Sequence, residues 1–217
     1  MSAMKSKIQY PNFKLERKYW KKNLIVAGVD ESGRGCLAGP VVAAAVIFKD
    51  TEVADIGIND SKMLTPKKRE ELYHIIKKHA LTYSVAFIDN RKIDEINILN
   101  ATFEAMNKSV AGLKVEPEHL LIDGNRFRGS YLPYSTVVGG DGISISIAAA
   151  SILAKVERDR YMVNKAHKKW PQYLFDKNKG YGTKKHFEIL TEHGYCPIHR
   201  LSFLKKGKSK QLELFAK

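Results

Sequence analysis

The stretch LIVAGVDESGRGCLAGPVVAAAVIF, residues 24–48, holds two apolar runs with a short glycine-containing turn between them. Both runs are short and rich in β-branched residues, which is typical of buried strands. We therefore predict strands over residues 24–30 and 40–48. The short connection between the two runs favours a hairpin.

The rest of the chain alternates between helical and extended patterns. Thr65 has the character of a helix N-cap, with Pro66 at the first helical position. Antiparallel strands therefore come first and helices then alternate with strands, which predicts an α/β fold with a mixed sheet and helices packed on it. The alanines at 148–150 would let the longest helix pack closely on that sheet. The further predicted elements are strands over 81–89, 119–123 and 135–138 and helices over 96–113, 143–169 and 184–192.

The chain has 217 residues, of which 44% are hydrophobic, and this is enough for one domain with a sizeable core. No apolar stretch approaches the about 20 residues that span a bilayer. The N-terminus has no apolar segment typical of a secretory signal. The two cysteines lie far apart in the chain, so we expect no disulfide framework and a cytoplasmic location.

Positive charge is concentrated in the C-terminal third. The formal net charge is +14, and residues 155–210 hold 15 Lys and Arg against 5 Asp and Glu, or +10 of that total. Lysines scattered over a solvated surface would keep the protein soluble, but they would not explain this concentration. It favours nucleic acid as a partner. A membrane surface is disfavoured because no amphipathic anchor accompanies the charge.

Four acids stand where predicted strands end or loops begin: Asp30, Glu31, Asp123 and Asp141. Asp123 or Asp141 alone is explained by the preference of Asp for turns and helix N-termini. Asp30 and Glu31 together repel each other and lose hydration at the tip of an apolar strand, and a bound divalent cation would compensate. Oxygen ligands favour Mg²⁺ or Mn²⁺. In a basic protein this set predicts phosphodiester hydrolysis with two ions.

The turn that follows the acids allows two interpretations. Glycines serve a tight hairpin turn, and they also let a backbone approach a sugar or phosphate closely. Arg34 beside the acids favours a binding site. Gly33, Gly35 and Ala38 also match the spacing of a dinucleotide-binding fingerprint. That fingerprint requires a helix after the glycines, whereas here Pro40 leads into an apolar β-branched run.

A zinc site is a second alternative. Histidines and a cysteine stand close together near the C-terminus, although a single cysteine and Pro197 match known zinc spacings poorly. We expect structural or substrate-contact roles for these histidines. The residues concerned are His186, His193, Cys196 and His199.

Six motifs follow one another over residues 24–204: GVDESGRGCLAGPVVAAAVI, NDSKMLTPKKRE, LIDGN, GDGISISIAAASILAKVERD, NKGYGTKKH and HRLSF. In this order, with compatible gaps, they resemble the motifs of type 2 ribonuclease H, specifically bacterial ribonuclease HII. The resemblance implies a ribonuclease H-like fold with a helical C-terminal part that clamps the hybrid. It implies an endonuclease that cuts the RNA strand of RNA–DNA hybrids and incises at single ribonucleotides embedded in DNA, leaving 5′-phosphate and 3′-hydroxyl ends.

The same resemblance implies roles for individual residues. Asp30, Glu31, Asp123 and Asp141 correspond to four catalytic carboxylates that hold two Mg²⁺ or Mn²⁺ ions. The turn reads the 2′-hydroxyl that separates RNA from DNA, and Tyr181 stacks on the sugar at the RNA–DNA step. Asp159 is expected to form helix salt bridges instead of binding metal. The implied substrate contacts are Gly33, Arg34, Gly35, Tyr181 and, at the nucleic-acid backbone, Ser61 and Lys62. A non-catalytic hybrid- or DNA-binding protein with this fold is the alternative.

The domain organisation expected from these patterns has three parts. Residues 1–23 form an N-terminal extension, residues 24–204 the catalytic domain, and residues 205–217 a flexible basic tail. After HRLSF, members of the family often continue with a proline, which this chain lacks. The segment QLELF resembles the peptide by which bacterial repair proteins dock on the DNA sliding clamp, through Gln211, Leu212, Leu214 and Phe215. Alternatively these apolar residues fold back on the core. We expect a monomer.

Overall fold

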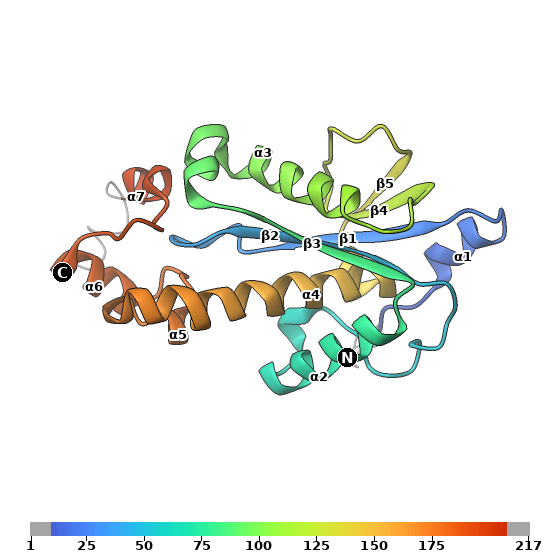
Figure 1. The fold of residues 1–217 in the computed structure, drawn as a ribbon, viewed down its shortest axis with the longest axis horizontal. Helices are drawn as coiled ribbons and strands as arrows, with labels where there is room; N and C mark the ends of the chain where they lie inside the picture. The colour runs from blue at the N-terminus through green and yellow to red at the C-terminus, as the bar shows by residue number, and fades with distance from the viewer. Residues whose placement is uncertain (1–9, 208–217) are drawn as a thin grey trace, which may run out of the picture.

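The computed structural model describes residues 10–207. A five-stranded sheet in the order β3-β2-β1-β4-β5 forms the centre, with helices on both faces and a helical part beyond one end (Figure 1). None of the helices described is long and apolar enough to cross a membrane. The strands are β1 (Val26–Ser32), β2 (Val41–Ile47), β3 (Thr82–Ile88), β4 (His119–Asp123) and β5 (Tyr134–Val137). The helices are α1 (Lys14–Trp20), η1 (Ser61–Met63), α2 (Pro66–His79), α3 (Asn90–Ala111), η2 (Gly140–Gly142), α4 (Ile145–Tyr161), η3 (Met162–His167), η4 (Pro171–Tyr173), α5 (Phe175–Asn178), α6 (Lys184–His193) and α7 (Leu201–Gly207).

The sheet is mixed, as predicted. Strands β1 and β2 form the expected antiparallel hairpin, and β3 pairs antiparallel with β2. β4 runs parallel to β1, with Val29 opposite Ile122. Asp30 and Asp123 each follow directly on these paired residues, so the parallel pairing brings both acids to the same end of the sheet.

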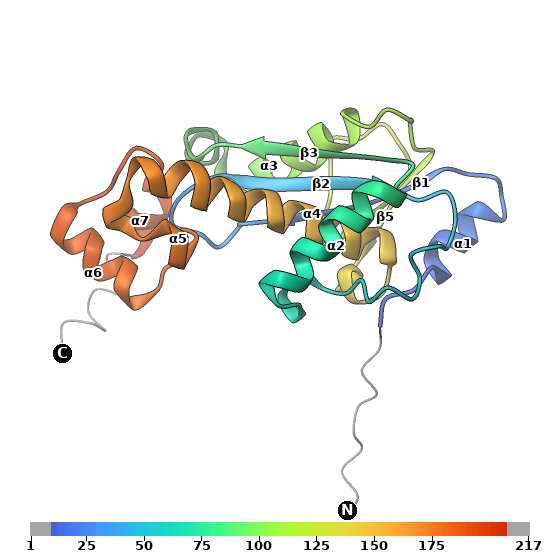
Figure 2. The same cartoon turned by 60° about the horizontal axis from the view of Figure 1, so that its bottom comes forward.

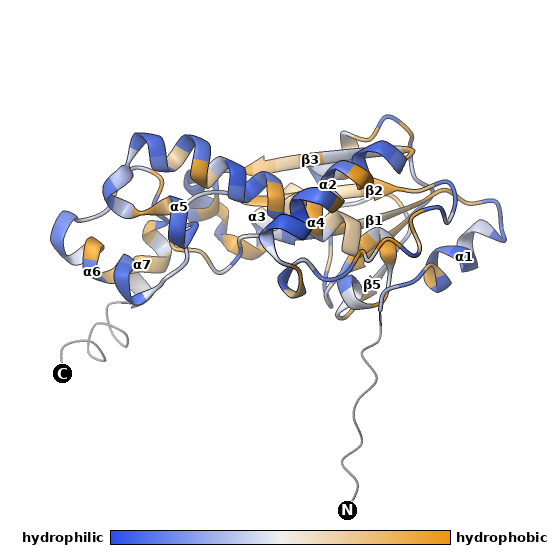
Figure 3. Ribbon diagram, turned by 90° about the horizontal axis from the view of Figure 1, so that it is seen from below, coloured by the Kyte–Doolittle hydropathy of each residue, from blue (hydrophilic) through white to orange (hydrophobic). Residues whose placement is uncertain are grey.

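Helices pack on the two faces of the sheet. α3 covers one face and α4 the other, and α2 packs on α4 (Figure 1). Ala148, Ala149 and Ala150 of α4 are fully buried, which confirms their predicted close packing. The approach is closest at Gly28 in β1, where an added Cβ would lie only 2.2 Å from the backbone of Ser146. In Figure 3, hydrophilic and hydrophobic residues alternate along α2, as expected of a helix with one buried face. Residues 145–154 of α4, in contrast, are all buried.

Residues 10–23 pack against the domain that we predicted to begin at residue 24. Phe13 lies in the core, and Glu16 is fully buried. The Oε1 atom of Glu16 accepts hydrogen bonds from the Ser144 hydroxyl at 2.6 Å and from the Ser146 N–H at 3.0 Å. The segment therefore holds the beginning of α4 in place, and the boundary at residue 24 does not separate two structural units.

The C-terminal helices gather beyond the end of the sheet (Figure 2). The predicted helix over 143–169 is divided, because α4 ends at Tyr161 and the π-helix η3 follows. Likewise the helix expected over 96–113 lies within the longer α3, which has a kink at Asn97. α7 continues to Gly207, so the tail predicted from residue 205 begins within a helix. The QLELF segment, residues 211–215, lies outside the described residues.

Candidate active site

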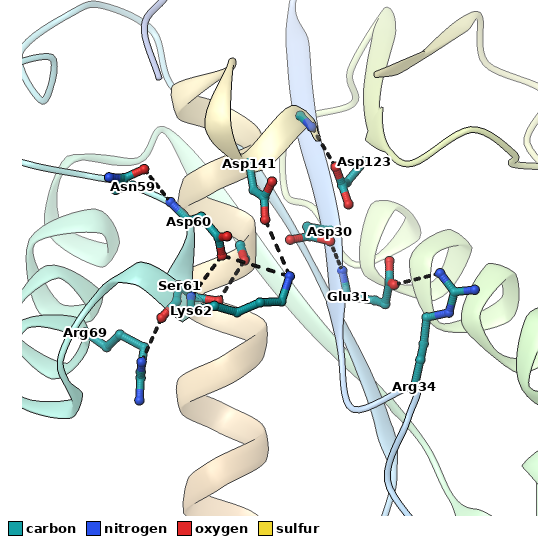
Figure 4. A network of polar contacts seen from close by, with 12 residues as sticks. Asp30, Glu31, Arg34, Asn59, Asp60, Ser61, Lys62, Arg69, Asp123 and Asp141 are labelled. Atoms are coloured by element: carbon teal, nitrogen blue, oxygen red, sulfur yellow. Dashed lines mark hydrogen bonds and ion pairs between the residues drawn. The ribbon is translucent and has the colours of Figure 1, made fainter. Parts of the chain in front are cut away.

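The four predicted carboxylates come together where β1 and β4 end. Asp30 and Glu31 lie in β1, Asp123 is the last residue of β4, and Asp141 lies in η2, just before α4. β1 continues through both of its acids, so Asp30 lies on the side of α4 and Glu31 on the opposite side (Figure 4). The Gly140 N–H donates to the Asp123 carboxylate at 2.7 Å, which ties η2 to β4. Residues more than ninety positions apart thus form one acidic cluster.

The electrostatics of this cluster favour a cation. Burial, together with the charges of Glu31 and Asp123, raises the pKa of Asp30 well above its usual value. Burial also raises the pKa of Glu31, although the charge of Arg34 opposes the shift. Burial and the charge of Asp60 raise the pKa of Asp141 to about 6. Each shift means that negative charge is held here at a cost in free energy, which a nearby positive charge would reduce.

Two basic side chains partly supply that positive charge. The Lys62 Nζ atom lies 3.7 Å from an oxygen of Asp141 and 4.0 Å from an oxygen of Asp60. Burial alone would lower the pKa of Lys62, but the charges of Asp60 and Asp141 raise it. Arg34 forms an ion pair with Glu31 at 3.2 Å. Lys62 therefore lies next to the carboxylates. The resemblance predicted only a contact with the nucleic-acid backbone for this residue.

The residues present fit a divalent cation in their chemistry. All the donors are carboxylate oxygens, the ligands that Mg²⁺ and Mn²⁺ prefer. Asp30 and Asp141 are only 3% and 8% exposed, so the repulsion between each of them and Asp123 is poorly screened by water. Over residues 10–204, no three His, Cys, Asp or Glu side chains are already grouped closely enough to hold an ion, and the Lys62 ammonium group lies among the acids instead.

Asp60 is a fifth acid at the site, which the sequence patterns did not single out. Its carboxylate accepts the Lys62 N–H at 2.9 Å and so caps η1. Ser61, next to it, is only 4% exposed, and its hydroxyl bonds that of Ser151 at 2.9 Å. Ser151 in turn bonds Asp30. The Ser61 hydroxyl is thus turned inward towards the acids.

Two buried arginines hold the loop over residues 33–40. Arg158 of α4 donates to the carbonyls of Pro40, Ala38 and Lys179 at 2.9, 3.1 and 2.9 Å. Arg200 donates to the carbonyls of Gly39 and Arg34, both at 2.9 Å. Neither guanidinium reaches solvent, so these two charges of the basic C-terminal third serve the fold and not the basic surface.

The two glycines of the predicted recognition turn differ in the space that surrounds them. Gly33 has φ +94°, and an added Cβ would lie 2.0 Å from the Arg158 Nε atom. Nothing lies within 4 Å of a Cβ built at Gly35. Packing against Arg158 therefore demands Gly33, whereas the space around Gly35 is open. The turn leads into β2 and not into a helix, which excludes the dinucleotide-binding arrangement.

Tyr181 lies beside this loop. The Gly180 carbonyl accepts the N–H groups of Leu37 and Ala38 at 2.8 and 3.3 Å. The Tyr181 ring is 39% exposed, and the Arg158 guanidinium carbon lies 5.7 Å from the ring centre. Burial and the neighbouring Cys36 raise the pKa of Tyr181 to about 12, so its hydroxyl stays protonated. The structure thus brings the predicted tyrosine and the predicted turn together.

Other residues considered from the sequence have ordinary partners. Asp159 forms an ion pair with Lys155 at 2.8 Å within α4, which confirms the predicted helix salt bridge. His186, Cys196 and His199 lie together, and their side chains hydrogen-bond one another. His193 is exposed beside Glu192.

Comparisons with known proteins agree with this arrangement. A sequence model of the family described as ribonuclease HII matches residues 27–206. Ribonuclease HII of Endomicrobium trichonymphae is 56% identical over 194 residues, which cover 88% of this chain and 91% of that protein. Ribonuclease HII of Caldicellulosiruptor saccharolyticus is 51% identical over 203 residues, which cover 93% and 98% of the two chains.

Solved structures with the same fold are also similar to the chain. Ribonuclease H2 of Pyrococcus horikoshii OT3 has a TM-score of 0.65 and 26% identity, with 82% of this chain and 93% of that one covered. Ribonuclease HII of Archaeoglobus fulgidus, solved in a complex with PCNA, has a TM-score of 0.68 and 28% identity, with 82% and 94% covered. The chain therefore belongs to the ribonuclease HII family and is a metal-dependent endoribonuclease of the ribonuclease H type, which acts on RNA–DNA hybrids.

Proposed function

We propose that this enzyme also incises at single ribonucleotides embedded in duplex DNA, leaving 5′-phosphate and 3′-hydroxyl ends, and so serves ribonucleotide excision repair. The observation that carries the proposal is the position of the acidic cluster beside the 33–40 loop and Tyr181. A cluster for phosphodiester hydrolysis that adjoins an open glycine turn suits a substrate with one sugar to be recognised. Hydrolysis and recognition then take place at adjoining parts of one surface.

The metal-binding part of the proposal assigns the ligands. Asp30, Glu31, Asp123 and Asp141 would hold two Mg²⁺ or Mn²⁺ ions. When bound about 3.5–4 Å apart, such ions activate water and stabilise the leaving oxygen of an in-line displacement. The raised pKa values of Asp30, Glu31 and Asp141 support cation binding, because a cation relieves the repulsion that causes them. A ribonuclease HIII with a similar fold was solved in complex with Mn²⁺.

The recognition part of the proposal assigns the turn and the tyrosine. Gly33, Arg34 and Gly35 would read the 2′-hydroxyl through backbone groups, and Tyr181 would stack on the adjoining sugar. The open space at Gly35 and the half-exposed Tyr181 ring support this assignment. Arg34 is tied to Glu31 at 3.2 Å, which would couple recognition to the carboxylates. Exposed lysines over residues 165–185 would contact phosphates without reading sequence.

Cleavage of two labelled duplexes tests the proposal. One carries a single ribonucleotide in DNA and the other is a continuous RNA–DNA hybrid, each with Mg²⁺, with Mn²⁺ or with excess chelator. We expect cleavage of both duplexes with either metal and none in chelator, with Asp123→Asn inactive on both. Asp55→Asn, which removes an exposed acid outside the site, is the matched control. Cleavage in chelator, or near-normal turnover by Asp123→Asn, would contradict the mechanism; binding of both duplexes without cleavage would favour the non-catalytic alternative.

A partner of the enzyme is proposed on the tail. Residues 211–215, QLELF, would dock on the bacterial DNA sliding clamp through Gln211, Leu212, Leu214 and Phe215. The Archaeoglobus fulgidus ribonuclease HII solved in a complex with PCNA supports a partner of this kind. Tethering to a clamp on DNA raises the local concentration of the enzyme. A peptide of residues 205–217 should bind purified clamp, and unchanged binding after Leu214→Ala with Phe215→Ala would refute the proposal.

We infer a monomer that works in the cytoplasm. Both cysteines, Cys36 and Cys196, are free and buried, which suits a reducing compartment. Sedimentation of the purified enzyme tests the monomer, and a dimer at micromolar concentration would contradict it.

A further inference from the structure

The C-terminal helical part encloses two histidines that the proposed mechanism does not use. His186 of α6 and His199, just before α7, are at most 1% exposed. Their Nε2 atoms lie 3.0 Å apart. The rings of Tyr173 and Phe175 pack around them. At this distance one ring must donate a hydrogen and the other must accept it, so the two imidazoles hold defined and different hydrogen positions.

A backbone N–H decides which ring donates. The Cys196 N–H points at the Nδ1 atom of His199 over 2.9 Å, so that Nδ1 carries no hydrogen. The Cys196 carbonyl is 3.2 Å from the same Nδ1, a longer contact, and it accepts the His199 backbone N–H at 3.0 Å. Neutral His199 therefore carries its hydrogen on Nε2 and donates to the Nε2 atom of His186. His186 must then carry its hydrogen on Nδ1.

The chain of hydrogen bonds ends at Tyr181. The His186 Nδ1 atom lies 2.8 Å from the Tyr181 carbonyl oxygen and donates to it. The same oxygen accepts the Thr183 N–H at 2.9 Å, so both of its lone pairs are used. The adjoining Gly180 carbonyl is bonded to Leu37 in the 33–40 loop. The backbone at 180–181 is thus held from the histidines on one side and from the loop on the other.

We propose that His186 and His199 are positioning residues, whose directed hydrogen bonds from Cys196 to Tyr181 hold the Tyr181 ring beside the turn at residues 33–35. The consequence for activity rests on the proposed reading of the RNA–DNA step by Tyr181. A single embedded ribonucleotide offers one 2′-hydroxyl, whereas a continuous hybrid offers many. Loss of these hydrogen bonds therefore reduces cleavage at the single ribonucleotide more than cleavage of the hybrid.

The surroundings of the two rings keep them neutral. The titratable groups that face His199 are His186, Cys196 and Tyr173, and His186 faces His199 and the apolar Phe175. Burial lowers the pKa of His186. Burial, together with His186, lowers the pKa of His199 to about 4. The chain of hydrogen bonds requires neutral rings, because a proton added to the Nε2 atom of His186 would face the N–H group at the Nε2 atom of His199.

The hydrogen positions are tested by NMR of the full-length enzyme labelled with ¹⁵N in its histidines. Long-range ¹⁵N–¹H correlations distinguish a ring that carries hydrogen on Nδ1 from one that carries it on Nε2. At pH 7 we expect His186 with hydrogen on Nδ1 and His199 with hydrogen on Nε2, assigned with His186→Asn and His199→Gln. The opposite pair of tautomers, or a charged ring at pH 7, would refute the proposed chain of hydrogen bonds, whatever the activity of the enzyme.

The effect on specificity is tested by a double-mutant cycle. The readout is kcat/KM on the single-ribonucleotide duplex divided by kcat/KM on the hybrid. His186→Leu should lower this ratio about 10- to 100-fold, the range that misplacing a contact group produces. Tyr181→Ala keeps the backbone carbonyl and should lower the ratio similarly. Adding His186→Leu to Tyr181→Ala should lower the ratio no further, because His186 acts through the ring already removed.

Matched variants separate positioning from general damage. His186→Asn keeps an N–H donor near the Nδ1 position and should preserve more of the ratio than His186→Leu. His193→Leu alters an exposed histidine of the same helix and should leave the ratio unchanged. If His186→Leu lowered the kcat/KM ratio by the same factor in the unmodified enzyme and in Tyr181→Ala, the positioning role would be overturned. An unchanged ratio in Tyr181→Ala would instead refute the proposed function of Tyr181, even with the tautomers as assigned.

Discussion

Two groups of buried ionisable side chains lie on either side of the 33–40 loop, and they are partnered in opposite ways. On one side, Asp30 and Asp141 face other carboxylates, and burial raises the pKa of both. On the other, Arg158 and Arg200 are fully buried and donate to backbone carbonyls of the loop. The acids repel one another, whereas the arginines each bind groups that would otherwise be buried without partners.

This difference separates the site from its scaffold. A buried charge that donates hydrogen bonds to backbone groups of the chain holds those groups in place. Buried carboxylates that face one another destabilise the fold until a cation reaches them. His186 and His199 belong with the arginines, because they too form hydrogen bonds to buried groups of the chain. Substitutions in the two groups should therefore change activity and stability in different proportions.

The largest effect on activity is expected from Asp30→Asn. The substitution removes the charge of a proposed metal ligand and should lower kcat about 100-fold or more, since even outer partners of ligands cost 10- to 100-fold. The same change removes a repelling charge, so the metal-free protein should melt at a higher temperature than the unmodified enzyme. Initial rates at saturating Mg²⁺ and thermal melts in chelator measure the two quantities. A lower melting temperature in chelator would show that Asp30 stabilises the fold by itself.

The largest effect on stability is expected from Arg158→Met. It leaves the carbonyls of Pro40, Ala38 and Lys179 without their donors, which should cost about 3 kcal/mol or more of the free energy of unfolding. Urea denaturation measures this cost. Arg160→Met is the matched control on the same helix, because Arg160 pairs with Glu70 near the surface and should cost about 1 kcal/mol or less. If both substitutions lowered the free energy of unfolding equally, the buried Arg158 would stabilise the fold no more than the surface Arg160.

The two groups should also respond to pH with opposite signs. The pKa of Asp141 is about 6 in the fold, raised by burial and Asp60, against about 3.9 when unfolded. The fold therefore binds more protons between these values, and the contribution of Asp141 to stability falls as pH rises from about 4 to about 6. The pKa of His199 is lowered by burial to about 4, against about 6.5 when unfolded, so its contribution rises over a similar range.

Melting temperatures in metal-free buffer from pH 4 to 7 test these signs. Asp141→Asn removes the falling contribution, so melting temperature should increase more steeply with pH than in the unmodified enzyme. His199→Gln removes the rising contribution and should flatten or reverse the increase. Three parallel curves would mean that neither group is responsible.

The smallest effect is expected from exposed charges, which belong to neither buried group. Lys177 and Lys185 have side chains that are 80% and 66% exposed. Changing either to Ala should weaken hybrid binding modestly and lower the slope of log affinity against log salt by about 1, as for one phosphate contact. Lys108→Ala, on α3, is the control and should leave the slope unchanged. A slope that changes equally in all three variants would argue against a binding surface in the C-terminal part.

Local patterns in the sequence were sufficient to predict much of the fold. Short β-branched runs ending in polar residues predicted the hairpin over residues 24–48, and the alanines at 148–150 predicted close packing on the sheet. The polar composition of residues 10–23 concealed Glu16, because burial of a single carboxylate leaves no periodic pattern. The kink at Asn97 and the π-helix after Tyr161 were also missed, since each is a local departure inside a regular helical pattern.

The sequence by itself indicated which residues we propose to carry the chemistry. Adjacent Asp30 and Glu31 at the end of an apolar strand are unusual enough to indicate a charged ligand on their own. Only the tertiary structure decided that Asp123 meets them, because β4 pairs with β1 across more than ninety residues. Only the structure separated buried Arg158 and Arg200 from the basic surface that the charge of the C-terminal third predicts. Their partners are backbone carbonyls, which every residue carries, so no pattern of side chains can indicate which arginine will find them.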